Sequence, residues 1–281
     1  MPGFSFGLPP FDVYRGTAEL FGHLAASHRS IHFVMSSSKV PPRTPSHGLA
    51  RVLSKLGVCS RSQAERAVRE GRVQVDGRVE RHPERPTDPE RQQIALDGRP
   101  VEASSRVYLA INKPRGIVTT AADEHGRHTV YNLLDGSGLP WLGPVGRLDK
   151  ASEGLLLMSN DSTWAARLTD PLQHVDKTYH VQIDCVPDAA LLERLLDGVV
   201  EHGERLAARR IALLRHGEKN AWLEVVLDEG RNRHIRRLLA AHGIGVLRLI
   251  RVAIGPLLLG DLPKGGWRHL SAGEVAELSR A

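Results

Sequence analysis

The sequence predicts an α+β protein in which a small helix–helix–hairpin module precedes a larger domain with a mixed, largely antiparallel sheet. At 281 residues the chain is longer than a typical single domain, so two domains are expected. Its hydrophobic content of 41% is enough for a substantial core and lies far from the disordered regime. Strand-like segments are frequent and helical segments fall irregularly between them, which favours α+β over a doubly wound fold.

We expect three regions: a disordered extension at 1–46, the small module at 47–104 and the large domain at 105–281. The extension is rich in Gly, Pro, Ser and His and has no sustained periodicity. It also lacks the basic segment and clean apolar core of a signal peptide. The stretch that begins at Met35 is Ser-rich like a flexible leader, so one hypothesis places the translation start there. The intact mass of the native protein would test that hypothesis.

The small module begins with two helices. Apolar residues recur at helical spacing from Leu49 to Leu56, and Gly57 ends this helix. A capping box at 62–65 predicts the start of a second helix that runs through Val68.

Two hairpins follow in the module, at 72–79 and 94–99, and each contains an Asp-Gly turn. Cations lie between the apolar positions of the two helices, which indicates a surface for a polyanion. The alternative is a protein-binding helical module, which the density of arginine argues against. The cations expected to bind this polyanion are Arg51, Lys55, Arg61, Arg66 and Arg69.

The large domain opens with a strand at 107–112, closed by a turn that contains Lys113 and Arg115. A turn with two cations suits a phosphate, although a solvated turn would have the same sequence. A loop reaches to Leu142. The later elements are predicted as a helix at 163–168, a strand at 177–183, a helix capped by Asp188, strands at 210–214 and 221–227, a helix at 235–242, a strand at 246–254 and a terminal helix capped by Ser271.

An acidic turn lies at the centre of the large domain. Asp149 follows Arg147 in a short polar turn, and the apolar run Leu155 to Met158 after it is typical of a buried strand. A carboxylate at the mouth of a rigid strand is held stiffly, and a nearby arginine favours its ionised form. Arg147 and Asp149 could equally be a structural ion pair.

The charge of the chain favours a polyanionic partner. The net charge is +6 and the isoelectric point about 9.6. The segment 230–251 holds six arginines and no acidic residue. Cys59 and Cys185 stand far apart and in no metal spacing, which indicates neither a disulfide nor a zinc site and favours a reducing cytoplasm. His125 and His128 lack further ligands nearby, and no apolar run approaches the length of a membrane span.

Four strings of the sequence resemble the ribosomal small- and large-subunit pseudouridine synthases. The fifteen residues from Gly146 to Asn160 match the signature of that family position for position. The turn at 112–116, the Lys-x-Tyr at 177–179 and the arginine-rich string at 228–239 match further motifs. The module at 47–104 resembles the S4 RNA-binding domain, which commonly precedes this synthase domain.

The resemblance implies roles for individual residues. Asp149 would be the catalytic nucleophile, Tyr179 would pack against the target uracil, and Arg236 would pair with Asp149. Leu249 falls near the apolar contact of the base pocket. Other cations of the large domain would face RNA phosphates, and they are Lys113, Arg115, Arg147, Arg231, Arg233, Arg237, Arg248 and Arg251. The family usually has Gln-Val where this chain has His234-Ile235.

The function expected from this resemblance is the isomerisation of one uridine of ribosomal RNA to pseudouridine, by a cytoplasmic monomer. The reaction consumes nothing, so no cofactor and no metal are expected, and no obligate protein partner or membrane is indicated. An alternative is a non-catalytic RNA-binding or ribosome-assembly factor on the same fold. A glycosidase that pairs Asp149 with Glu153 is a third hypothesis. The target uridine, the ribosomal subunit and whether Asp149 attacks base or sugar stay open.

Overall fold

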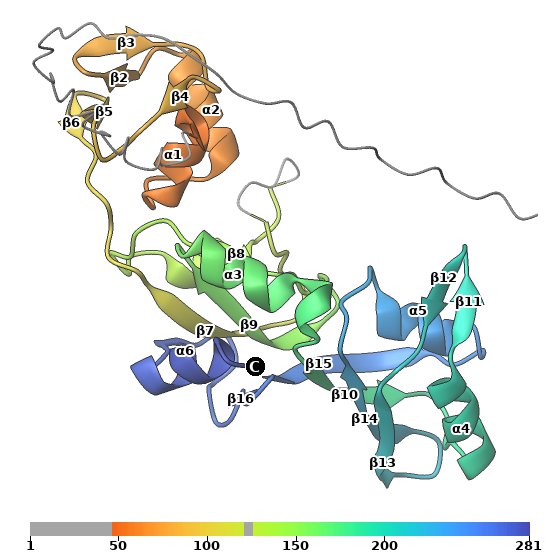
Figure 1. The fold of residues 1–281 in the computed structure, drawn as a ribbon. Helices are drawn as coiled ribbons and strands as arrows, with labels where there is room; N and C mark the ends of the chain where they lie inside the picture. The colour runs from red at the N-terminus through yellow and green to blue at the C-terminus, as the bar shows by residue number, and fades with distance from the viewer. Residues whose placement is uncertain (1–46, 121–125) are drawn as a thin grey trace, which may run out of the picture. The chain divides into compact units, whose positions relative to one another are not determined.

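The computed structural model describes residues 47–120 and 126–281 (Figure 1). The disorder expected for 1–46 and the hypothesis of a translation start at Met35 lie outside the described residues. Residues 121–125 of the predicted loop also lie outside them.

The first module contains two helices followed by short strands. Its elements are β1 (His47–Gly48), α1 (Leu49–Lys55), α2 (Arg61–Arg69), β2 (Val73–Val75), β3 (Arg78–Glu80), β4 (Pro86–Thr87), β5 (Ile94–Leu96) and β6 (Arg99–Pro100). β3, β2, β5 and β6 pair antiparallel in that order, and both predicted hairpins are confirmed. Asp76 and Gly77 have φ values of +53° and +77°, as the tight hairpin turn requires. The module has its own core of buried aliphatic side chains, which run from Leu49 to Ile94.

The second helix of the module begins earlier than predicted. Its cap is Ser60, whose side chain accepts a hydrogen bond from the backbone N–H of Gln63, while the Gln63 side chain accepts one from the Ser60 N–H. The predicted capping box at 62–65 is therefore wrong by two residues. Both positions offer a serine three residues before a Gln or Glu, and the extended backbone of Ser60 decides between them.

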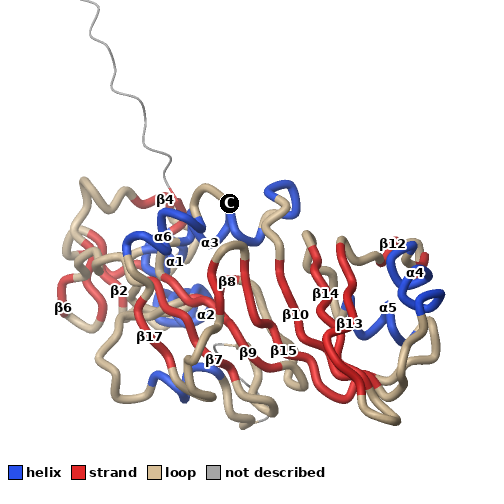
Figure 2. Tube along the Cα trace, turned by 90° about the horizontal axis from the view of Figure 1, so that it is seen from below, coloured by secondary structure: helices blue, strands red, loops and turns tan. Residues whose placement is uncertain are grey.

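The large domain is built on one nine-stranded sheet (Figure 2). Its main path runs β13–β14–β10–β15–β9–β7–β17, with β8 paired to β9 and β16 paired to β15. Only the β15–β9 pair is parallel, so the largely antiparallel sheet is confirmed. The strands are β7 (Tyr108–Lys113), β8 (Gly143–Val145), β9 (Glu153–Ser159), β10 (Lys177–Ile183), β13 (Arg210–His216), β14 (Ala221–Leu227), β15 (Val246–Ile254), β16 (Leu257–Leu258) and β17 (Trp267–His269).

The helices of this domain begin at side-chain caps in most cases. Asp161, Asp188 and Ser271 accept hydrogen bonds from the first backbone N–H groups of α3, α4 and α6. Two of these caps, Asp188 and Ser271, are those that the sequence predicts. The remaining elements are η1 (Val130–Leu134), α3 (Ser162–Thr169), η2 (Pro171–Gln173), α4 (Ala189–Asp197), β11 (Val199–Glu201), β12 (Glu204–Leu206), α5 (His234–Ala240) and α6 (Ala272–Leu278).

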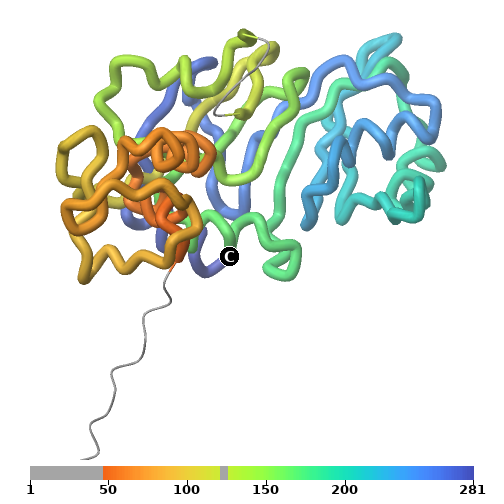
Figure 3. Tube along the Cα trace, turned by 90° about the horizontal axis from the view of Figure 1, so that it is seen from above, coloured from red at the N-terminus to blue at the C-terminus, as the bar shows by residue number. Residues whose placement is uncertain are grey.

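Strand β9 is buried on both faces, which explains its continuous apolar sequence. Leu156 and Met158 pack into the larger core of the domain. Leu155 and Leu157 point the other way, into a second core that contains side chains of α3 and α6. In Figure 3 the green strand β9 and the blue strand β15 run side by side, although almost a hundred residues separate them in the sequence.

Gly154 allows β9 and β15 to approach each other. It pairs with Arg251 and has a φ of +100°. A Cβ at this position would lie 2.3 Å from the carbonyl oxygen of Arg251, closer than any side chain tolerates. The glycine is therefore required both by its backbone angle and by the neighbouring strand.

Candidate active site

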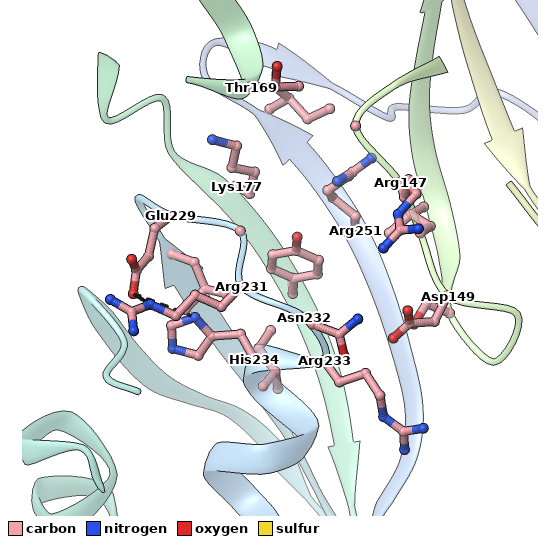
Figure 4. A pocket seen from close by; sticks show the side chains of 18 of the residues that line it. Arg147, Asp149, Thr169, Lys177, Glu229, Arg231, Asn232, Arg233, His234 and Arg251 are labelled. Carbon is pink, nitrogen blue, oxygen red and sulfur yellow. Dashed lines mark hydrogen bonds and ion pairs between the residues drawn. The ribbon is translucent and has the colours of Figure 1, made fainter. Parts of the chain in front are cut away.

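A cavity of about 400 Å³ lies against strands β10 and β15, between the turn that precedes β9 and the segment that leads into α5 (Figure 4). Asp149, Tyr179, Arg236 and Leu249 all line it. The four residues span a hundred positions of the sequence, and the fold brings them to one enclosure. A cavity of this size is in the range of small-molecule sites and can hold a single nucleoside base.

The backbone of the turn that carries Asp149 is hydrogen-bonded to the buried Lys113 side chain. The Lys113 side chain is fully buried, and its ammonium donates hydrogen bonds to the carbonyl oxygens of Pro114, Asp149 and Ser152 at 3.1, 3.2 and 2.8 Å. Burial lowers the pKa of Lys113 to about 8, against the opposing charges of Asp149 and Glu153. A backbone fixed in this way leaves the exposed Asp149 carboxylate facing the cavity.

Arg236 supports the same turn from the other side. It lies on α5, and its Nη2 donates a hydrogen bond to the carbonyl oxygen of Ala151 at 3.1 Å. Burial lowers the pKa of Arg236, the Asp149 charge raises it, and Arg233 and Arg115 lower it further.

Asp149 makes no direct ion pair with Arg236 or with Arg147 within the described residues. Hydrogen bonding of Arg236 to the backbone explains this difference from the expected pairing: the guanidinium orients the turn and acts on Asp149 through space. The alternative of a structural Arg147–Asp149 ion pair is not what the structure shows, because both side chains are exposed and line the cavity.

Tyr179 and Leu249 lie on the part of the cavity wall that strands β10 and β15 form. Tyr179 on β10 pairs across the strands with Arg251 on β15, and Val181 pairs with Leu249. Alternate residues of a strand share a face, so Tyr179 lies on the same face as Lys177, and Leu249 on the same face as Arg251. All four line the cavity. Tyr179 and Leu249 are buried, which makes this part of the wall rigid and apolar.

The segment before α5 closes another side of the cavity (Figure 4). Arg231 donates a hydrogen bond to Glu229 at 2.7 Å, and the buried His234 ring lies with its Nδ1 3.9 Å from the same carboxylate. Burial lowers the pKa of His234 more than Glu229 raises it, so the ring is neutral at neutral pH. The His234-Ile235 departure from the family pattern is thus a buried ring in the cavity wall.

The structure places the predicted RNA-binding cations in different surroundings. Arg147, Arg231, Arg233 and Arg251 line the cavity. Arg115 is exposed, and its guanidinium donates to the Leu247 carbonyl at 3.4 Å. The module residues are all exposed, although Arg61 forms ion pairs with glutamates of the module. RNA contact stays a prediction for all of these residues, which also include Arg51, Lys55, Arg66 and Arg69.

Three of the cations predicted to contact phosphates are engaged by groups of the protein itself. Lys113 is fully buried beneath the Asp149 turn. Arg237 uses its guanidinium to bind Glu201 and Glu204, which joins α5 to the hairpin of β11 and β12.

Arg248 is the third of these cations. It makes two hydrogen bonds to the Glu153 carboxylate at 3.1 and 3.2 Å, and it lies over the Trp222 ring on the face of the sheet away from Leu249. In each of the three cases, protein groups occupy some of the donors that a phosphate would use, and RNA contact stays a prediction.

Glu153 is a structural residue that the sequence did not reveal. Its carboxylate is almost fully buried and binds Arg248 and Lys264, the latter at 2.7 Å. Burial raises the pKa of Glu153, but the two cations outweigh this and hold it below its ordinary value. Glu153 does not line the cavity, so it is not the second acid that the glycosidase hypothesis pairs with Asp149.

The described residues include no cluster of three or more possible metal ligands. Cys59 and Cys185 are both free thiols. Among those same residues, no helix is long and apolar enough to cross a membrane.

Comparisons with known proteins identify the class to which this fold and site belong. A model of the RNA pseudouridylate synthase family matches residues 107–241, and a model of the S4 domain matches residues 48–92. A solved pseudouridylate synthase superposes with a TM-score of 0.58 at 27% identity, which covers 83% of this chain and 100% of that one. The fold is therefore an S4 domain followed by a pseudouridine synthase domain.

Two relatives match this chain over most of its length. An uncharacterized RNA pseudouridine synthase of Aquifex aeolicus is 37% identical over 233 residues, which cover 82% of this chain and 93% of that protein. Ribosomal large subunit pseudouridine synthase B of Bacillus subtilis is 34% identical over 234 residues, which cover 82% and 94%. The chain belongs to the RNA pseudouridine synthase family and is an isomerase that acts on RNA.

Proposed function

We propose that this enzyme converts one uridine of ribosomal RNA to pseudouridine, with Asp149 as the nucleophile or base. The observation that carries the proposal is the convergence of Asp149, Tyr179, Arg236 and Leu249 on one cavity. Ribosomal RNA is favoured because the Bacillus subtilis relative is a ribosomal large subunit synthase and because an S4 domain precedes the catalytic domain. The basic character of the chain suits a large RNA, on which we propose a cytoplasmic monomer to act.

The geometry suggests a division of labour among these side chains. The target nucleotide must leave its stack to reach the cavity, which costs roughly a few kcal/mol. Stacking of its base on the Tyr179 ring returns about 1–3 kcal/mol, and Leu249 supplies an apolar contact beside it. The N-glycosidic bond then breaks, and the ribose carbon forms a bond to a carbon of the base. That carbon loses its hydrogen as a proton and the freed base nitrogen takes up a proton, so the reaction is an isomerisation.

Whether Asp149 acts as a nucleophile or as a base, its carboxylate must be charged and held in a fixed position. Lys113 and Arg236 fix its backbone through the carbonyls of Asp149, Ser152 and Ala151. These contacts support Asp149 equally as an attacking group on the base or the sugar and as a proton acceptor.

The experiment replaces Asp149 with asparagine in the full chain. Asp149→Asn keeps the size of the side chain and removes its charge, so we expect turnover to be abolished while RNA affinity changes less than twofold. The matched control is Asp135→Asn, an acid of a loop outside the cavity lining. Pseudouridine formation that persists in Asp149→Asn would end the assignment.

The identity of the RNA requires a separate measurement. Pseudouridines in the ribosomal RNA of a deletion strain are compared with those of its parent, and the missing position is restored by the wild-type gene but not by Asp149→Asn. A non-catalytic ribosome-assembly factor predicts instead that both genes restore growth and that no pseudouridine is lost.

A further inference from the structure

The cavity has a cationic end that the catalytic proposal leaves without a role. Lys177 on β10 and Arg251 on β15 both line it, and in Figure 4 their side chains lie on the far side of the cavity from His234 and Arg233. The strand register places this pair next to Tyr179, because Arg251 is its cross-strand partner and Lys177 stands two residues before it on the same face.

The Arg251 side chain lacks a full set of partners. Only 5% of Arg251 is exposed, and its Nε donates a hydrogen bond to the Leu155 carbonyl at 2.7 Å. Its Nη2 is enclosed and has no hydrogen-bond partner within the described residues. An unsatisfied buried donor costs about 1–3 kcal/mol, and more when the group is charged. A cavity-lining guanidinium in this condition indicates a missing acceptor on a ligand.

Lys177 adds a second positive charge to the same place. Its ammonium makes no hydrogen bond or ion pair with a described residue. Burial lowers the pKa of Lys177 and the Arg251 charge lowers it further, whereas Asp176 and Asp228 raise it. Neither carboxylate is bonded to the ammonium. Two adjacent cations without a bound counter-charge repel each other, and an anion between them would remove that repulsion.

The other charged groups of the cavity do not supply this anion. Glu229 is engaged with Arg231 at 2.7 Å. Asp149 lies on the turn whose backbone is hydrogen-bonded to Lys113 and Arg236, and its carboxylate forms no ion pair with Lys177 within the described residues. Arg147, which also lines the cavity, contributes a further exposed cation.

We propose that Lys177 and Arg251 form a binding site for a backbone phosphate of the RNA, belonging to the flipped nucleotide or to its immediate neighbour. This inference rests on the proposed function and adds the recognition of the nucleotide to it. A phosphate matches the site better than the uracil does, because two cations gain far more from a charged oxygen than from a neutral carbonyl. The phosphate would position the nucleotide so that the base lies against Tyr179 with its reacting bonds towards Asp149.

The test measures the binding of uridine, uridine 5′-monophosphate and uridine 3′-monophosphate to the full chain at low salt, by titration calorimetry or NMR. We expect one monophosphate to bind at least about tenfold more tightly than uridine. Arg251→Met and Lys177→Met should each reduce this preference to about twofold or less and leave uridine binding unchanged. Arg251→Lys keeps a charge at the site and should retain part of the preference.

The control is Arg215→Met, which removes an equal charge above the Trp222 ring, away from the cavity lining. It should keep the full preference for the monophosphate. Should Arg251→Met destabilise the fold, Lys177→Met still decides, because the Lys177 ammonium makes no hydrogen bond or ion pair with a described residue. The 5′ and 3′ monophosphates distinguish the phosphate before the nucleotide from the phosphate after it.

Two results would overturn the proposal. Equal affinities for uridine and both monophosphates would show that no phosphate is recognised. An equal loss of uridine and monophosphate binding in Arg251→Met and Lys177→Met would show that the two cations contact the nucleoside itself. The readout is binding and not turnover, so an Asp149→Asn enzyme that stays active would refute the proposed function and leave this test intact.

Discussion

Replacement of Lys113 by methionine tests whether this buried lysine holds the catalytic turn. The side chains are similar in length, so Lys113→Met removes the ammonium with little change of packing. Three hydrogen bonds from a charged donor are lost, at about 1.5–3 kcal/mol each. Against this, the lowering of the lysine pKa from 10.5 to about 8 corresponds to about 3 kcal/mol of unfavourable burial that the variant avoids.

The net loss of stability expected for Lys113→Met is the difference between these two contributions, about 2–6 kcal/mol. For a domain of this size it lowers the Tm by roughly 5–20 °C. Displacement of Asp149 by about 1 Å should reduce kcat about a hundredfold. RNA affinity and its dependence on salt should stay unchanged, since a buried ammonium releases no counterion.

Calorimetry gives the Tm, single-turnover kinetics give the chemical step, and filter binding at several salt concentrations gives the slope of log K against log salt. Lys150→Met is the control, because it removes an exposed lysine of the same turn. A Lys113→Met enzyme with normal kcat and a slope reduced by about 0.7–0.9 would refute the reasoning and make Lys113 a phosphate contact.

The pH dependence of stability provides a second readout on Lys113. Its pKa is about 8 in the folded state and near 10.5 in the unfolded chain. Between these values the unfolded chain binds more protons, so the wild type gains stability as pH rises, by up to about 1.4 kcal/mol per pH unit. The stability difference between wild type and Lys113→Met should therefore grow from pH 8 to pH 10, and a constant or shrinking difference would contradict the burial of the charge.

Three further changes test the contacts that shape the site. Arg237→Ala should lower the urea midpoint of unfolding through the loss of its pairs with two glutamates, at an unchanged salt slope of RNA binding; a reduced slope would show that Arg237 contacts RNA. Glu153→Gln should destabilise the chain by about 3–5 kcal/mol, since it leaves two cations around a buried neutral group. Because the folded pKa of Glu153 is lowered, its contribution is present above pH 4.5 and is lost as the pH falls, so the variant should show a flatter acid unfolding profile; an unchanged profile would contradict this. Gly154→Ala should prevent folding at 37 °C or cost more than about 3 kcal/mol, because its Cβ would meet the Arg251 carbonyl, and soluble, active protein at wild-type Tm would refute the close approach.

Much of the fold follows from the sequence because its signals are local. Strand β15 was predicted with its observed bounds, and the Asp188 and Ser271 caps begin the helices expected from them. The short strands β8, β11, β12 and β17 were not predicted. They have three residues each and exist through pairing with distant strands or with each other, which no local period reveals.

The site was predictable only in part. The motifs located Asp149, Tyr179, Arg236 and Leu249, and the structure brings them to one cavity. They gave no information about which cations are free, because that depends on burial and on acids far along the chain, such as Glu153 for Arg248.

Strand alternation could have sorted some of these residues in advance. Lys177 stands two positions before Tyr179 and therefore faces the cavity with it, while Arg248 and Leu249 are adjacent and face opposite sides. The lysine of the Lys-x-Tyr motif was thus a site residue that the pattern already contained. No local pattern predicts the burial of Lys113, because a turn with two cations and a glycine is typical of an exposed loop.

The parallel seam between β9 and β15 is only two residue pairs long, Glu153 with Ile250 and Gly154 with Arg251. Beyond these two pairs, β9 and β15 are not paired, and each contributes to the wall of the cavity, β9 through Leu157 and β15 through Leu249. Because this parallel pairing is so short, the contacts of Glu153, Gly154 and Arg251 hold the two strands together, and Arg251 also lines the cavity. A change that weakens the contact between β9 and β15 is therefore expected to disturb the cavity as well.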